Sequence, residues 1–196
     1  VQSVHEVQFF DKSGRIVYRL THESDLPVAA YEANGKREFL TSNGSNNLQL
    51  NNESGSIIKQ FPCNGKLLDY AIYRQNGKAF VSILSDKSFT TVDLTKRKVI
   101  AKQTADSTFQ LISNERFAAA VQVNKNQAII LQAGSKKQFQ VSNGVQILAC
   151  YSQAQNQMFI FKRNTALFAY DQNGNKSWEK TLPVNEISSC EIYQHP

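Results

Sequence analysis

Three aspartates could be mistaken for catalytic carboxylates: Asp11, Asp93 and Asp171. Each of them follows an apolar stretch and comes before a polar turn. They recur at one offset of a repeated unit, which is not the distribution expected of a single active site. An aspartate side chain accepts backbone hydrogen bonds at the beginning of a tight turn. We therefore interpret these residues as turn-forming rather than catalytic.

The remaining residues with metal-binding or nucleophilic side chains are few. The cysteines are Cys63, Cys150 and Cys190, and the histidines are His5, His22 and His195. Three cysteines in 196 residues are not typical of a disulfide framework. Cys150 and Cys190 share a repeat position that is apolar in the other units, so we expect both to be buried, whereas Cys63 is expected to be exposed in a connecting loop. The histidines are too scattered in the repeat for a three-histidine metal site, so no metal is predicted.

Composition narrows the class of protein further. The chain is 41% hydrophobic and 19% charged, with a net charge of +6, which fits one folded domain rather than a disordered chain. It has no apolar run long enough to cross a membrane. Nucleophile-elbow, Walker, dinucleotide and Cys-x-x-Cys motifs are all missing from the sequence, so we predict no cofactor. The chain starts at Val1, without an initiator Met, so we expect a processed or excised chain that is soluble, and favour an exported or periplasmic location over a cytoplasmic one.

A repeat of about 40 residues organises the whole sequence. Its anchor positions are Asp11, Asn51, Asp93, Gln132 and Asp171, separated by 40, 42, 39 and 39 residues. Seven positions after the anchors lie Tyr18, Ile58, Ile100, Phe139 and Trp178. We expect these five side chains to pack between neighbouring units, and Trp178, the largest of them, to be buried.

Each unit is expected to contain four short strands joined by tight turns, which we label a to d. The dipeptides Asn34-Gly35 and Asn76-Gly77 separate strands a and b, and Asn-Gly closes two-residue hairpins. No useful helical periodicity is present, so helices should be rare. Four antiparallel strands per unit of this length are typical of a β-propeller blade. We predict an all-β fold, a β-propeller of about five four-stranded blades, with an extended β-sandwich array as the alternative. The innermost strands a should carry Ala30, Ile72, Leu111 and Cys150.

The segment from Ala169 to Trp178 resembles a known repeat. Its pattern, Ala-x-Asp-x-x-Gly-x-x-x-Trp, is similar to the quinoprotein (PQQ-like) propeller repeat, a relative in shape of the WD40 repeat. The match is sharp only in this last unit, and the other units keep the spacing and the apolar character without the tryptophan. The resemblance implies a propeller fold. It does not imply a quinone cofactor, because the quinone and metal sites of the dehydrogenases have no counterpart in this sequence.

The units do not fill the chain evenly. We expect a single propeller domain over residues 1–196, with complete repeats at about 26–64, 65–105, 106–143 and 144–184. Residues 1–25 and 185–196 would form a fifth, incomplete blade, with strand a at Ile187–Tyr193 and with strand b missing. The blade could be three-stranded, trimmed, or completed by a strand from a partner protein.

Basic residues gather in the turns between strands c and d. We name this set the basic rim, and it contains Arg15, Lys96, Arg97, Lys98, Lys136, Lys137 and Lys176. These turns should share one face of a propeller, where an acidic protein or an anionic surface could bind. The alternative interpretation is a solvated set of hairpin tips. Nucleic acid is the least favoured ligand, because the turns lack aromatic residues for base stacking.

The function that follows is a non-enzymatic interaction module, a scaffold or adaptor in a larger protein assembly. The alternatives are a ligand-binding propeller of the lectin-like or small-molecule-binding type and, last, a propeller enzyme. We expect a protein partner that is acidic or that completes the open blade.

Overall fold

The computed structural model describes residues 5–10, 13–22, 26, 28–33, 35–43, 46–153 and 156–183. All regular structure in these residues is β-strand, and every pairing is antiparallel. The strands form four four-stranded sheets and one two-stranded sheet. The predicted all-β propeller is therefore confirmed, as is the predicted scarcity of helix in the described part of the chain.

The strands follow one another in space as they do in sequence. The N-terminal hairpin contains β1 (His5–Phe10) and β2 (Ile16–His22). The first blade contains β3 (Ala29–Ala33), β4 (Lys36–Asn43), β5 (Asn47–Asn51) and β6 (Ile57–Pro62). The second blade contains β7 (Leu67–Gln75), β8 (Lys78–Ser85), β9 (Ser88–Asp93) and β10 (Lys98–Thr104).

The third blade contains β11 (Gln110–Ser113), β12 (Ala118–Asn124), β13 (Gln127–Gln132) and β14 (Ser135–Gln140). The fourth blade contains β15 (Gln146–Gln153), β16 (Asn156–Arg163), β17 (Ala166–Asp171) and β18 (Lys176–Thr181).

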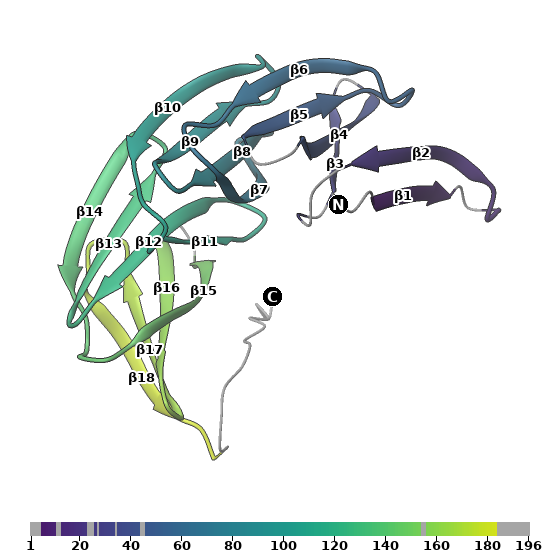
Figure 1. Cartoon of the computed structure of the whole chain (residues 1–196). Coiled ribbons are helices and arrows are strands. Elements are labelled where there is room, and N and C mark those ends of the chain that lie inside the picture. Colours follow the sequence, from purple (N-terminus) through teal and green to yellow (C-terminus); the bar gives the residue numbers. More distant parts are fainter. Residues whose placement is uncertain are drawn as a thin grey trace.

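The sheets stand side by side along an arc, with the first strand of each blade toward the inside and the fourth strand at the outer edge (Figure 1). The innermost strands β3, β7, β11 and β15 carry the four residues predicted for strand a, namely Ala30, Ile72, Leu111 and Cys150. The shared offset of these residues in the repeat therefore corresponds to a shared structural level.

Turn chemistry explains where the strands end. Asn76 and Gly77 have φ angles of 51° and 72°, the left-handed pair that an Asn-Gly hairpin requires between β7 and β8. Asp93 and Asp171 are the last residues of β9 and β17. The Lys96 amide donates to Asp93 Oδ1 at 2.9 Å, and the Asn173 and Asn175 amides donate to Asp171 Oδ1 at 2.7 and 2.9 Å. The predicted turn-forming role is confirmed for these two aspartates, whereas Asp11 lies outside the described residues.

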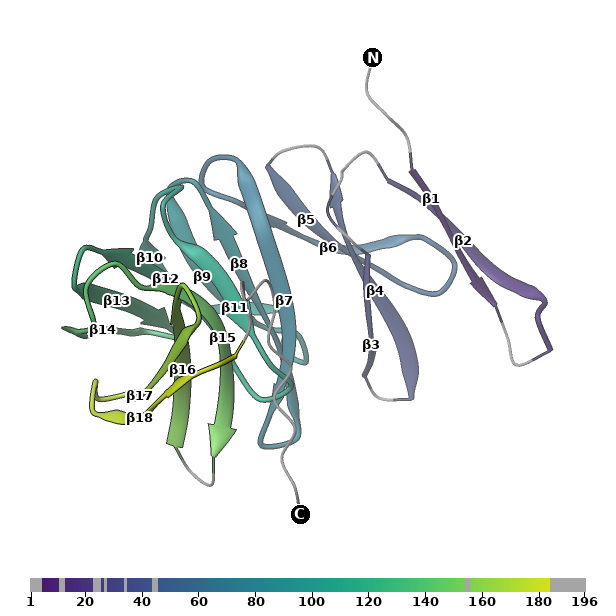
Figure 2. The same cartoon turned by 90° about the horizontal axis from the view of Figure 1, so that it is seen from below.

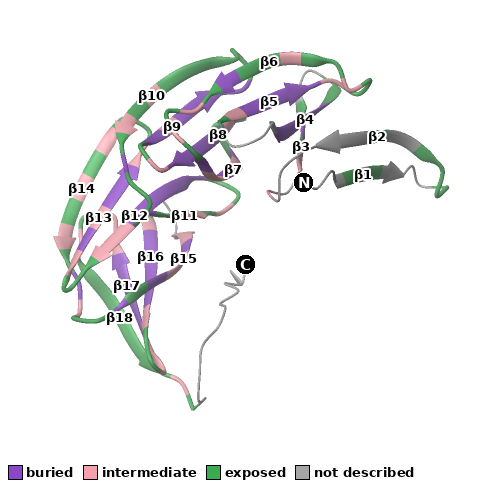
Figure 3. Ribbon diagram, viewed as in Figure 1, coloured by how far each residue is buried: buried purple, intermediate pink, exposed green. Residues whose placement is uncertain are grey.

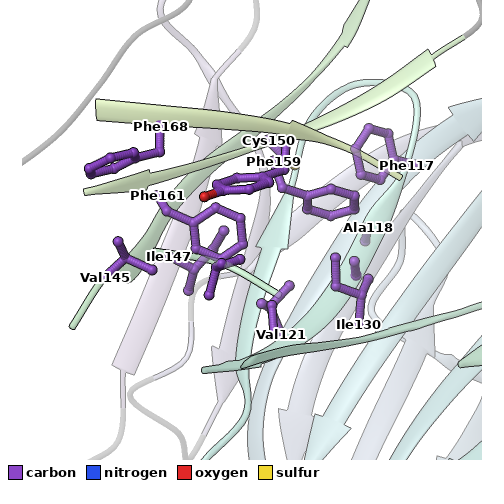
Figure 4. Packing of buried hydrophobic residues seen from close by; sticks show 14 of the residues in the cluster. Phe117, Ala118, Val121, Ile130, Val145, Ile147, Cys150, Phe159, Phe161 and Phe168 are labelled. Carbon is purple, nitrogen blue, oxygen red and sulfur yellow. The ribbon is translucent and has the colours of Figure 1, made fainter. Parts of the chain in front are cut away.

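The core lies between the blades. Each central strand presents one apolar row to the preceding blade and another to the following blade, and each of the second strands β8, β12 and β16 contains a buried run of at least four residues (Figure 3). Between the third and fourth blades, Phe159, Phe161 and Phe168 belong to the same apolar cluster as Val121 and Ile130 (Figure 4). Similar apolar clusters fill the two preceding interfaces. Burial of apolar rows on both sides of a blade is what stabilises repeat architectures of this kind.

The structure corrects the prediction for the residues seven positions after the anchors. Phe139 and Ile58 are half-buried and pack against interblade clusters, but Ile100 is 49% exposed and Trp178 is 37% exposed. Ile100 is the extra residue of a β-bulge, because Val99 pairs with Val92 and Ala101 pairs with Thr91. Trp178 lies on β18, the outer strand of the last described blade, and no described strand packs beyond it (Figure 2). The Tyr18 side chain lies outside the described part of the structure.

The described strands form an open arc, with the N-terminal hairpin at one end and β18 at the other (Figures 1 and 2). The predicted strand at 187–193, together with Cys190 and His195, lies outside the described residues. The shared fifth blade and the single-domain organisation therefore remain predictions.

Candidate interaction surface

The basic rim lies at one end of the sheets. In an up-and-down sheet of four strands, the a–b and c–d turns are at the same end, and the b–c turns and the links between blades are at the other. Lys96 and Arg97 lie in the turn between β9 and β10, and Lys98 and Lys176 are the first residues of β10 and β18. Arg15 precedes β2 directly, whereas Lys136 and Lys137 lie inside β14 rather than in its turn.

Contacts between successive blades hold part of this surface in place. Lys137 Nζ donates to Gln172 Oε1 at 3.4 Å, which joins the third blade to the c–d turn of the fourth. Phe139 stacks on Tyr170 with 5.9 Å between ring centroids. A β-carbon on Gly174 would lie 2.3 Å from the β-carbon of Phe139, so only glycine fits at this crossing. The outer strand of one blade therefore packs directly on the turn of the next.

Two members of the basic rim form ion pairs. Lys176 Nζ lies 2.9 Å from Glu179 Oε2 at the surface, and the hydrogen bond and charge of Glu179 raise the pKa of Lys176. Arg97 Nη2 lies 2.8 Å from Glu38 Oε1, and the Glu38 side chain is only 7% exposed. Arg97 was predicted from the sequence as a candidate partner-binding residue, and the structure ties it to the preceding blade.

Glu38 lies between two partners. Its second carboxylate oxygen accepts a hydrogen bond from the Tyr31 hydroxyl, and both residues are buried. Burial, with the hydrogen bond and negative charge of Glu38 added to it, raises the pKa of the Tyr31 phenol. Tyr31 therefore stays protonated and donates, while Arg97 neutralises the carboxylate. Since this group joins strands of the first blade to a turn of the second, it fixes the relative position of the two blades.

Two further cations, which were not predicted from the sequence, lie at the same end of the sheets. The c–d turn of the first blade, between Asn51 and Ile57, carries Glu53 and no lysine or arginine. Lys36 and Arg37, at the beginning of β4, lie beside it and line a cleft of about 470 Å³ with Arg97. Both residues follow an a–b turn, whereas the basic rim was defined from the c–d turns alone. Because successive turns alternate between the two ends of a sheet, the a–b turns lie at the same end as the c–d turns, and this rule would have indicated Lys36 and Arg37 from the sequence.

A second cavity, of about 650 Å³, lies along the inner strands β11 and β15. Its lining includes the polar residues Asn114, Glu115 and Arg116. Cys150 also reaches it from the buried cluster, and burial raises the pKa of its thiol to about 12. A thiol with so high a pKa is a poor nucleophile, which agrees with the predicted structural role of Cys150.

The remaining cysteine and the other titratable groups within the described ranges show no cluster typical of a reactive site. Cys63 is half-buried rather than exposed, because it packs against the cluster between the first two blades, and burial raises the pKa of its thiol to about 11. In the described ranges, no three His, Cys, Asp or Glu residues lie together as a metal-binding group. The side chains of His5 and His22 are not among those described. The described residues also contain no helix that is long and apolar enough to cross a membrane.

No protein-family model matches this chain, and no curated protein matches its sequence. Solved structures do match. BamB from Moraxella catarrhalis is 8% identical with a TM-score of 0.60, over 90% of this chain and 58% of its own. BBS1N, solved in complex with ARL6DN, is 9% identical with a TM-score of 0.57, over 82% of this chain and 56% of its own.

The dihydro-heme d1 dehydrogenase NirN, solved in complex with DHE, is 12% identical with a TM-score of 0.61, over 91% of this chain and 42% of its own. These neighbours are propellers, and at such low identity the likeness concerns the fold alone. The chain spans about half the length of the structures that it matches.

Proposed function

We propose that this chain is a non-enzymatic β-propeller module that acts as a scaffold or adaptor and binds an acidic protein partner through the basic rim. The observation that carries the proposal is that exposed cations from the second, third and fourth blades project at one end of the sheets, among them Lys96, Lys136 and Lys176. Charges displayed in this way attract an acidic surface and increase its rate of encounter.

The packing between blades supports a recognition role. The Phe139–Tyr170 stack and the pairing of Arg97 with Glu38 hold neighbouring turns in fixed positions. A surface that is already ordered loses little conformational entropy when a partner binds. BBS1N, a neighbour in fold, was itself solved in complex with ARL6DN. We also propose that the chain belongs to the quinoprotein-like propellers, because of the repeat at Ala169–Trp178. We further propose that it is exported or periplasmic.

Crosslinking in the cells of origin tests the location of the interface. Lysine-reactive reagents should join the partner to Lys96, Lys98 and Lys136 rather than to lysines at the opposite end of the sheets. The comparison set is Lys66, Lys87 and Lys125, which are equally exposed and lie in links between blades or in b–c turns. Crosslinks concentrated on the comparison set would overturn the proposed orientation.

Charge reversal tests the mechanism with the partner so identified. The variant Lys96→Glu/Lys98→Glu/Lys136→Glu should associate about tenfold more slowly at low salt and lose most of its salt dependence, because exposed charges act mainly on encounter. The matched control Lys66→Glu/Lys87→Glu/Lys125→Glu changes the net charge equally at the other end. Equal slowing by both variants would show that only net charge matters and would contradict a specific rim.

A further inference from the structure

The cleft between the first and second blades has a chemistry different from that of the rest of the basic rim. It combines an apolar wall at Ile58, which is half-buried, with the cations of Lys36, Arg37 and Arg97 at its edge. A cleft with these two features suits a ligand that is apolar at its centre and negatively charged around it.

Two of the three cations are available for a ligand. Within the described part of the chain, the Lys36 and Arg37 side chains are exposed and make no hydrogen bond or ion pair. Arg97 has one guanidinium nitrogen on Glu38, and a guanidinium has further donors for a second carboxylate. Long basic side chains around an apolar wall favour a carboxylate-rich ligand over a neutral one.

The carboxylates of the cleft would repel an acidic ligand, but only one of them is exposed at the opening. Glu38 is buried and is already neutralised by Arg97 and Tyr31. Glu53 is exposed, and its Oε1 accepts a hydrogen bond from the Arg37 backbone amide at 3.1 Å. The exposed charges around the opening are therefore positive on balance, and Glu53 is the one group there that should weaken the binding of an acidic ligand.

We infer that this cleft binds an acidic peptide segment with one bulky apolar side chain, which inserts against Ile58 while flanking carboxylates pair with Lys36, Arg37 and Arg97. The inference rests on the proposed function, since it names the part of an acidic partner that the rim would hold most specifically. Such a cleft would supply the anchor of the interface, and the remaining rim cations would steer the approach.

The test uses the full 196-residue chain and a fluorescent synthetic peptide with a central phenylalanine flanked on both sides by Asp-Glu pairs. Fluorescence anisotropy should show saturable binding. Replacing the phenylalanine by alanine should weaken the peptide about tenfold, as expected for the loss of a buried aromatic anchor. Replacing the acidic residues by lysines should abolish binding. Equal affinity of the phenylalanine and alanine peptides would overturn the inference.

Protein variants locate the site. Lys36→Glu/Arg37→Glu should weaken the peptide about tenfold or more, whereas Lys66→Glu/Lys87→Glu at the opposite end should leave its affinity within about twofold. Glu53→Gln should strengthen binding. The substituted side chains are exposed, so the variants should fold, and thermal melts check this. An unchanged affinity in Lys36→Glu/Arg37→Glu would remove the site from this cleft.

The same variants separate this inference from the proposed function. If the peptide fails to bind but Lys96→Glu/Lys98→Glu/Lys136→Glu still slows association of the native partner, the cleft is wrong and the basic rim stands. If the peptide binds as described and the rim variant has no effect on the partner, the proposed function is wrong and the cleft stands.

Discussion

Asp171 organises its turn through one carboxylate. Oδ1 accepts the amides of Asn173 and Asn175, and Oδ2 accepts the Asn175 side-chain amide at 2.9 Å. Desolvation alone would raise the pKa of Asp171, but the hydrogen bonds from Asn175, Asn173 and Gly174 together outweigh it and lower the pKa. In the first blade the same task falls to Asn52, whose Oδ1 accepts the amides of Ser54 and Ser56, while the anchor Asn51 points inward to Thr41.

The lowered pKa of Asp171 predicts a pH-dependent contribution to stability. It should be present above about pH 4, the ordinary pKa of an aspartate, and should be lost as the pH falls through the lower pKa of the folded state. Asp171→Asn should therefore be less stable than the original chain at pH 7, and the difference should shrink below about pH 4. Denaturant melts across this range measure it. A difference that stays constant with pH would show that the charge of the carboxylate has no part in the turn.

Gly174 should tolerate alanine poorly. Its φ is 86°, and a β-carbon would clash with Phe139, so Gly174→Ala should cost about 2–4 kcal/mol from backbone strain and overpacking together. Gly77→Ala is the matched control, because Gly77 has a φ of 72° and open space around the added carbon. It should cost only about 1 kcal/mol. Chemical denaturation compares the two, and equal losses would mean that the contact with Phe139 is not tight.

Trp178 should contribute less to stability than its size suggests. At 37% exposure, with its Nε1 donating to the Tyr151 hydroxyl at 3.3 Å, Trp178→Ala should cost about 1 kcal/mol. Phe139→Ala removes a ring that is packed between two blades and should cost about 2–3 kcal/mol. Equilibrium unfolding gives both values. A loss of about 3–5 kcal/mol for Trp178→Ala would instead mean that a further element covers this side chain.

At the scale of strands and turns, polar contacts fix one blade on the next. The Tyr70 hydroxyl of β7 donates to the Leu40 carbonyl of β4 at 3.0 Å, and the Tyr170 hydroxyl accepts the Ser142 amide at 3.0 Å. The Arg74 amide of β7 donates to the Glu115 carbonyl at 2.8 Å, which joins the second blade to the a–b turn of the third. Apolar packing alone would allow the sheets to slide, and these directional bonds set their register.

The ion pair between Arg97 and Glu38 should contribute measurably to stability, because it joins the first blade to the second. Arg97→Met leaves a buried carboxylate without its counter-ion and should cost about 1–2 kcal/mol, less than a fully buried pair because Arg97 is half-exposed. In a Glu38→Gln background the same change should cost under about 0.5 kcal/mol, since no charge is left unpaired. A double-mutant cycle by denaturation measures this. Additive losses would show that the two side chains act independently.

For the whole molecule, the open arc predicts uneven stability. The second and third blades have a neighbour on both faces, whereas the hairpin of β1 and β2 lies at one end of the described arc and meets the first blade through β2 and β4. Amides of β8 and β12 should therefore exchange with solvent most slowly, and those of β1 and β2 among the fastest. Hydrogen exchange with mass spectrometry measures the order. Protection of β1 equal to that of β8 would mean that the hairpin has another strand beside it, as the predicted fifth blade requires.

Local sequence signals were sufficient to predict strands, turns and the repeat. Alternating apolar residues, Asn-Gly pairs and aspartates at strand ends act over a few residues, so they can be read without knowledge of the partners. For this reason the placement of Ala30, Ile72, Leu111 and Cys150 on innermost strands could be predicted. The same local signals were sufficient to assign the basic residues to c–d hairpins, but their ion pairs could not be predicted.

Only the tertiary structure decided how the blades meet. Ile58 and Ile100 are both the extra residue of a β-bulge, yet Ile58 packs between blades and Ile100 is 49% exposed, so the local pattern does not decide which of the two is buried. Arg97 pairs with Glu38 because neighbouring blades bring together residues tens of positions apart, and the folding of the first blade places Lys36 and Ile58 in one cleft. The physical reason is that strand formation depends on local alternation, whereas pairing across blades depends on the exact fit of two packed surfaces, which the order of residues along one strand does not specify.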